Sequence, residues 1–99
     1  MTSFADFQTA DRRLVLLRAL AAAAQYKANA FLLRSYANSV GHVVSADQIE
    51  TDLAWLGEQG LITVERVQDV TIATIKPRGL DVGNGSAQVP GVARPQPGY

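Results

Sequence analysis

SADQIETDLAWLGEQGLI, residues 45–62, is the stretch of this 99-residue chain that decides its fold. Ser45, followed three residues later by Gln48, is a capping box, which marks the start of a helix. The apolar residues that follow are spaced by four and three positions and form one buried stripe, Ile49, Leu53 and Leu56. Gly60 is a typical residue for the end of a helix. The stretch therefore predicts an amphipathic helix that leads directly into another element.

Two strands are predicted after this helix. Residues 61–67 and 70–75 are rich in Val, Ile and Thr, which favour strands. Gln68-Asp69 alone separates them, so they are expected to form a tight hairpin, whose turn type stays open because neither residue is Gly. Pro77 ends the second strand, and a short helical turn is expected over residues 78–82.

A first helix is predicted from Ser3, capped together with Asp6, to about Ala24. Its apolar residues recur at helical spacing on one face, Phe4, Phe7, Leu14, Leu17, Ala21 and Ala24. Residues 3–10 either extend this helix or form a separate arm. In so small a domain, we expect a partner subunit to cover the two phenylalanines.

A second helix is predicted from a cap at Asn29 to about Val40, with Gly41 ending it. Its buried face is expected to contain Phe31 or Leu32, together with Leu33, Tyr36 and Val40. The link at residues 42–44 is expected to be a short strand that pairs with the hairpin.

Helix, helix, short strand, helix and hairpin predict a mainly α, α+β domain of the winged helix-turn-helix type. It would have three helices, a β-hairpin wing and a short extra C-terminal turn. Residues 1–10 would be the helical arm or helix extension, and residues 11–82 the winged-helix domain. Residues 83–99, rich in Gly and Pro, would be an extended or disordered tail.

The sequence also resembles known families. Residues 45–62 resemble the third helix and wing entry of ArsR- and MarR-type regulators. Four further stretches resemble a family of uncharacterised, ArsR-like winged-helix proteins encoded by Mu-like phages and prophages: DRRLVLLRAL at 11–20, LAWLGEQGLI at 53–62, RGLDV at 78–82 and VPGVARP at 89–95. The resemblance implies the fold and a phage or prophage origin, but no mechanism.

Composition limits the class of protein. The chain has no cysteine, 47% apolar residues and zero net charge, which is typical of one globular domain without disulfides or thiolate chemistry. Residues 1–6 show no signal-peptide pattern, and no apolar run is long enough to span a bilayer. We therefore expect a cytoplasmic protein, in a bacterial host cell, with no membrane partner.

No catalytic motif, glycine-rich phosphate loop or metal-ligand pattern is present. His42 is the only histidine, and without cysteine or a second histidine a zinc site is not expected. The sequence therefore predicts a binding protein, not an enzyme, with no cofactor, metal or small-molecule substrate.

The first hypothesis is a dimeric, phage-encoded DNA-binding protein of the transcriptional-regulator type. Its candidate DNA contacts lie on the third helix and around the wing, Ser45, Gln48, Thr51, Arg66, Lys76 and Arg78. Charge argues against it, because residues 35–65 contain no Lys or Arg and five acids. Three of these acids, Asp47, Glu50 and Asp52, would face phosphates on the solvent side of the third helix.

The alternative is a non-catalytic adaptor or assembly factor that uses the same scaffold, with its acidic third helix, to bind a protein. Candidate interface residues are the aromatic and apolar side chains of the arm, third helix and tail, Phe4, Phe7, Trp55, Val89 and Val92. Trp55 either covers the wing or the second helix within one subunit or anchors a partner.

Overall fold

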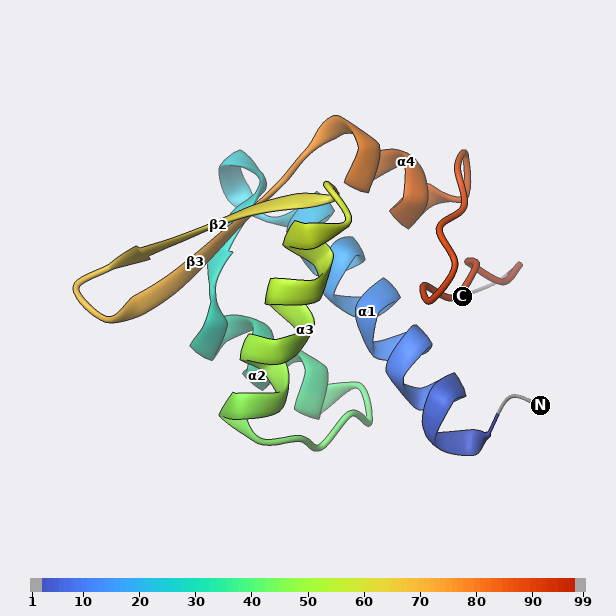
Figure 1. Cartoon of the computed structure of the whole chain (residues 1–99), viewed down its shortest axis with the longest axis horizontal. Helices are drawn as coiled ribbons and strands as arrows, with labels where there is room; N and C mark the ends of the chain where they lie inside the picture. Colours follow the sequence, from blue (N-terminus) through green and yellow to red (C-terminus); the bar gives the residue numbers. More distant parts are fainter. Residues whose placement is uncertain (1–2, 98–99) are drawn as a thin grey trace.

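The computed structural model describes residues 3–97, which form an α+β fold (Figure 1). The described chain contains four α-helices and one three-stranded antiparallel sheet. In chain order the elements are α1 (Phe4–Ala22), a 3-10 turn (Ala24–Tyr26), β1 (Lys27–Asn29), α2 (Ala30–Ser39), α3 (Ala46–Glu58), β2 (Ile62–Val67), β3 (Val70–Ile75) and α4 (Pro77–Asn84).

Helix α1 is the central helix of the domain. The capping box between Ser3 and Asp6 is confirmed, and the helix is continuous from Phe4, so residues 4–10 extend it. Leu14 to Leu17 are all buried because α2, the sheet and α4 pack around different sides of this part of the helix. The helix ends at Ala22, two residues earlier than expected.

Helix α3 follows the prediction closely. Ser45 caps it through Oγ, which accepts a hydrogen bond from the backbone N–H of Gln48. The predicted stripe is fully buried and forms the centre of the core, Ile49, Leu53 and Leu56. The Gln48 side chain does not complete the capping box, however, because its amide donates to Asp52 at 3.3 Å.

The sheet has the strand order β1-β3-β2, and its third strand is not the predicted one. Lys27–Asn29 pairs with β3, opposite Ile72 to Thr74. Val43 and Val44 lie outside the sheet, so that prediction was wrong. The backbone of Val44 is instead bonded to side chains of α2, through Asn38 and Arg34.

The structure identifies the type of turn that joins β2 and β3. Gln68 and Asp69 both have positive φ, 51° and 65°, which is the conformation of a type I′ turn. This turn matches the twist of the two strands, so the absence of Gly is tolerated at a local cost in backbone strain.

The predicted buried face of α2 was wrong in part. Leu33 and Ala37 are its buried residues, whereas the remaining large apolar side chains are exposed, Phe31, Leu32, Tyr36 and Val40. A ten-residue helix presents only one narrow stripe to the core, and Ala37 permits close approach there. Much of the apolar surface of α2 therefore lies outside the core.

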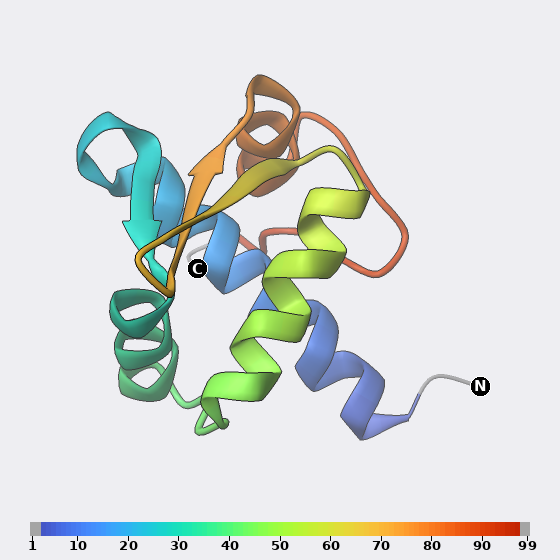
Figure 2. The same ribbon diagram turned by 60° about the vertical axis from the view of Figure 1, so that its left-hand side comes forward.

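After β3 the structure has a helix longer than the expected short turn, followed by a segment without helix or strand. Helix α4 covers two turns, and Gly79 within it leaves no room for a side chain beside the Leu61 carbonyl. Residues 86–97, which we call the strap, contain no helix or strand but run from α4 back toward α1 (Figure 2). Among the helices of residues 3–97, none is long and apolar enough to cross a bilayer.

Candidate functional site

The three candidate contact residues of α3 lie along its N-terminal half. Ser45 and Thr51 are exposed, and Gln48 is half-buried. Each is already bonded within the helix: Ser45 caps it, Thr51 donates to the Asp47 carbonyl at 3.0 Å, and Gln48 donates to Asp52. A hydroxyl and an amide have more than one hydrogen-bonding position, so these groups can still bind a ligand.

Asp52 is not on the solvent side of α3, which corrects the sequence interpretation. Its side chain is buried, with 1% exposure for the residue, and forms an ion pair with Arg12 of α1, which is 5% exposed. Arg12 donates from both Nε and Nη2, the latter to Oδ1 at 3.2 Å. The pair joins α1 to α3 and removes one of the three carboxylates from the surface.

Glu50 is the second acid of α3 whose carboxylate is bonded within the protein. Its carboxylate accepts a hydrogen bond from Thr71 Oγ1 at 2.8 Å, and Thr71 in turn accepts one from Arg66 Nη1 at 3.0 Å. Arg66 also donates to the Asp69 carbonyl at 3.2 Å. This chain of bonds joins the β2–β3 hairpin to α3 and connects the Glu50 carboxylate, through Thr71, to the Arg66 guanidinium.

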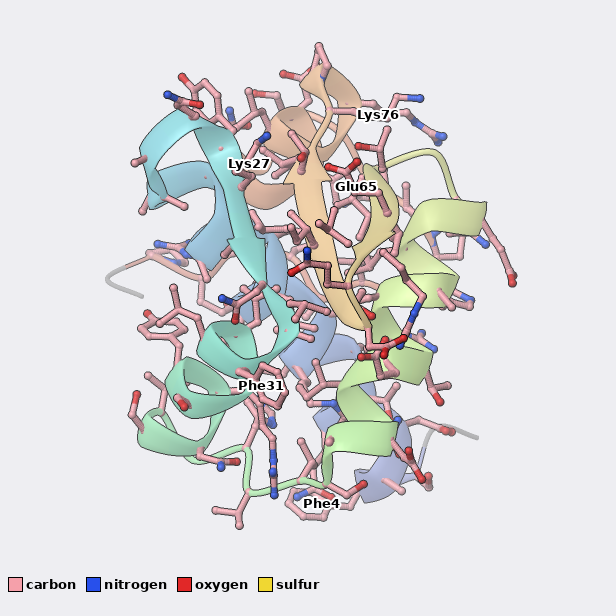
Figure 3. All side chains as sticks on the ribbon, turned by 90° about the vertical axis from the view of Figure 1, so that its left-hand side faces the viewer. Phe4, Lys27, Phe31, Glu65 and Lys76 are labelled. Atoms are coloured by element: carbon pink, nitrogen blue, oxygen red, sulfur yellow. The ribbon has the colours of Figure 1, made fainter. Side chains whose placement is uncertain are left out.

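Lys76 and Arg78 do not join this site. Arg78 donates to the carbonyl of Gln59 at the C-terminal end of α3, and the Lys76 backbone bonds Leu61. Figure 3 shows Lys76 near the top of the view, well separated from Phe31 on α2 in its lower half. Ala46, the first residue of α3, lines the same recess as Phe31, so the start of α3 lies beside Phe31. The six candidates therefore split into a group of four around α3 and the β2–β3 hairpin and a pair at the end of β3.

The face formed by the N-terminal half of α3, the β2–β3 hairpin and the start of α2 carries charges of both signs. Asp47 and Asp69 are exposed on it, and Arg66 is its exposed cation at the wing. Arg34 is half-buried and donates from Nε to Val44. Such a face offers hydroxyl, amide and guanidinium donors in reach of one another. Its net charge is negative, because its acids Asp47, Glu50 and Asp69 outnumber its cations Arg34 and Arg66.

Trp55 is half-buried within its own chain, and its indole ring contacts α1 and the strap. The Arg13 guanidinium lies 3.8 Å from the centroid of the indole ring and donates from Nη1 to the Gly91 carbonyl at 3.0 Å. A methyl group on Gly91 would lie 2.9 Å from the ring. Burial lowers the pKa of Arg13, and the negative charge of Asp52 opposes this shift. Trp55 is thus a contact between α3, α1 and the strap.

The strap has two further attachments. Val89 is buried in the core and Val92 packs against it, so Val89 has no surface to offer a partner. The backbone N–H of Ala93 donates to the Ala10 carbonyl of α1 at 3.1 Å. The sequence identified the apolar residues of the tail but assigned Val89 to an interface instead of the core.

Phe4 and Phe7 are exposed, as expected for residues without a partner inside the domain. They line a recess together with Val40 and His42. His42 Nε2 lies 2.7 Å from Asp11 Oδ2, which connects the loop after α2 to α1. The sequence missed this partnership and the exposed stripe of α2, because an i, i+4 apolar spacing looks the same whether a chain's own core or a partner covers it.

Two relatives match almost the whole chain. "Uncharacterized protein gp26" of Escherichia phage Mu is 42% identical over 92 residues, 93% of this chain and 95% of the relative. An uncharacterized protein of Haemophilus influenzae is 39% identical over 94 residues, 89% of this chain and 91% of the relative. No family model and no solved structure matches the chain. The resemblance to Mu-like phage proteins is thus confirmed, and the chain belongs to the family that includes gp26 of phage Mu.

Proposed function

We propose that this protein is a winged-helix DNA-binding protein of the transcriptional-regulator type, which acts as a dimer. In this proposal α2 and α3 form the helix-turn-helix pair, the β2–β3 hairpin is the wing, and β1 closes the sheet. Helix α3 would enter the major groove with its N-terminal half, as second helices of such pairs do.

The main support for this proposal comes from the contacts that the acidic residues of α3 make. Asp52 is buried against Arg12, and Glu50 is held in the bonds with Thr71 and Arg66. Of the three carboxylates that would have faced phosphates, only Asp47 is exposed. Because phosphate repulsion from this helix is smaller than the sequence suggested, the charge objection to DNA binding is weaker.

The positions of the hydrogen-bond donors suggest which part of the DNA each residue would contact. Ser45, Gln48 and Thr51 would make hydrogen bonds to base edges or phosphates from α3. Arg66, held at the wing by Thr71 and Asp69, would contact a phosphate beside the groove. Lys76 and Arg78 are outside this footprint, so they are not part of the proposed site.

Replacing Arg66 with alanine is expected to weaken binding to duplex DNA and to reduce the slope of log K against log salt by about 1, the effect of losing one phosphate contact. The matched control is Arg78→Ala, since Arg78 also donates to a backbone carbonyl but lies at the wing base. Its salt slope should equal that of the unmodified protein. Fluorescence anisotropy over a salt series measures both, and equal slopes for all three proteins would remove the wing from the DNA site.

A second function, a protein-binding adaptor, is favoured by one observation. Phe31 is 65% exposed and lies on the same face as the start of α3, in a recess lined by Ala46, Glu50 and Asp69. An exposed aromatic ring beside carboxylates is suited to a basic protein segment. If the protein is an adaptor, Phe31→Ala is expected to abolish capture of such a partner. If α3 binds DNA, the same substitution is expected to change the affinity for duplex DNA only modestly.

A further inference from the structure

Three hydrogen-bonded side chains connect α3 to the β2–β3 hairpin. Thr71 Oγ1 on β3 donates to Glu50 Oε1 at 2.8 Å and accepts from Arg66 Nη1 at 3.0 Å. Arg66 is exposed and Glu50 is half-buried, whereas Thr71 between them is buried, with 3% exposure. The exposed arginine is therefore joined to α3 through a hydroxyl that solvent hardly reaches.

The register of the sheet brings Thr71 to Arg66. The two residues lie directly opposite each other in the β2–β3 ladder, and opposite residues of an antiparallel pair project to the same side of a sheet. Arg66 also donates from its other terminal nitrogen, Nη2, to the Asp69 carbonyl at 3.2 Å. Because both terminal nitrogens are bonded to the hairpin, the orientation of the guanidinium plane is fixed.

The chemistry of the two charged groups determines the direction of these bonds. An ionised carboxylate only accepts hydrogen bonds, and a guanidinium only donates them. The single proton of the Thr71 hydroxyl therefore points to Glu50, and a lone pair of the same oxygen faces Arg66. Hydrogen bonds to ionised groups are stronger than those between neutral groups. Glu50 thus sets the orientation of the hydroxyl that holds Arg66.

Arg66 keeps free donors while it is held in this way. A guanidinium has five N–H donors, and the bonds to Thr71 and Asp69 use one each. The remaining donors are available to the oxygens of a phosphate group. A long side chain that becomes immobile on binding costs affinity, and this cost is avoided when the side chain is already held in its bound position.

We propose that Glu50 and Thr71 are positioning residues, which hold the Arg66 guanidinium on the α3 face ready to bind a phosphate of duplex DNA. This inference rests on the proposed function and assigns Glu50 an effect opposite to that of its charge. A carboxylate near DNA weakens binding by repelling phosphates. The acceptor oxygen of the same side chain strengthens binding, because it orients the hydroxyl that holds Arg66.

Thr71→Val, which removes the hydroxyl, is expected to lower the affinity for duplex DNA by about 2- to 12-fold, the cost of immobilising one long side chain. The slope of log K against log salt should not change, because Arg66 still binds its phosphate in the complex. Thr71→Ser retains the hydroxyl and should restore the affinity. Fluorescence anisotropy measures these affinities, and circular dichroism establishes that each variant folds.

The same substitution in an Arg66→Ala background tests whether Thr71 acts through Arg66. In that background Thr71→Val is expected to cause no further loss of affinity, because the side chain that it positions is absent. An equal loss in both backgrounds, or a folded Thr71→Val protein with unchanged affinity, would overturn the proposal.

Glu50→Gln and Glu50→Ala separate the position of Glu50 from its charge. Both substitutions remove the negative charge, but only glutamine keeps an acceptor oxygen for the Thr71 hydroxyl. Glu50→Ala is therefore expected to bind duplex DNA less tightly than Glu50→Gln, again by about 2- to 12-fold. Equal affinities for these two folded proteins would show that Glu50 is not a positioning residue.

The order of the Arg66 side chain can be measured without DNA. Nitrogen-15 relaxation of its Nε–H group, identified by the signal that Arg66→Ala lacks, is expected to show lower order in Thr71→Val than in the unmodified and Thr71→Ser proteins. Equal order in all three would overturn the positioning even if the protein binds DNA. Lower order in Thr71→Val, from a protein that binds no duplex, would support the positioning and reject only the proposed function.

Discussion

Replacing Asp52 with alanine is expected to lower the free energy of unfolding by about 3–5 kcal/mol. The change leaves the Arg12 guanidinium buried between α1 and α3 with its charge unpaired, since both Nε and Nη2 of Arg12 donate to this one carboxylate. Gln48 also loses its acceptor. Urea unfolding followed by circular dichroism measures the loss.

Asp47→Ala is the matched control on the same helix. Asp47 is exposed in the first turn of α3, so its removal costs only the interaction with the helix dipole, about 0.3–1 kcal/mol. Replacing both members of the buried pair, as in Arg12→Met with Asp52→Leu, is expected to recover most of the stability, because no charge is left unpaired. Equal losses for Asp52→Ala and Asp47→Ala would contradict the buried ion pair.

Gly91→Ala is expected to destabilise the protein by about 2–4 kcal/mol and to change the fluorescence of Trp55. Gly91 has a φ of 98°, which an alanine adopts only with strain, and the added methyl group would lie within 3.0 Å of both the indole ring and Arg13. The strap would have to move away from α3. Because Trp55 is the only tryptophan, its emission reports this contact directly.

The control for Gly91→Ala is Gly41→Ala. Gly41 has nearly the same φ, 100°, but no atom lies within 4 Å of an added methyl group. Gly41→Ala therefore measures the backbone strain alone, about 1–2 kcal/mol, and should leave the Trp55 emission unchanged. If the two variants lost the same stability and had the same emission, the strap would not lie on Trp55.

The elements that the sequence predicted well are those defined by local signals. The caps at Ser3, Asn29 and Ser45 and the strand residues 70–75 depend on neighbours within a few positions, and each is found as expected. Boundaries set by the same signals differ by one or two residues. Local chemistry is sufficient for these features because the capping atoms and the capped N–H groups belong to one turn.

The predictions that failed depend on which distant segment lies opposite a residue. The spacing of apolar residues around Asp52 does not show that its carboxylate is buried. Its burial is tolerated because Arg12, forty positions earlier in the chain, pairs with it. Likewise, the edge of β3 is taken by residues 27–29 instead of 43–44. A single sequence gives the strand character of a segment but not its partner.

The candidate site was predictable in part for the same reason. The α3 residues and Arg66 were identified from their order in the chain, and the structure brings them to one face. Lys76 was included because it flanks the predicted wing, yet six strand residues separate it from the turn and place it at the other end of the sheet. The sequence gives the negative net charge of residues 35–65, but it does not show which of these acids are paired or hydrogen-bonded in the fold.

Binding of the unmodified protein to duplex DNA, measured over a salt series, is the most direct test of the central claim. The account predicts salt-sensitive binding that is tighter for fragments flanking the protein's own gene than for random duplex of the same length. A folded protein that binds neither duplex at about 50 mM salt, where several phosphate contacts strongly favour the complex, would contradict it and leave the protein-binding adaptor as the function of the α3 face.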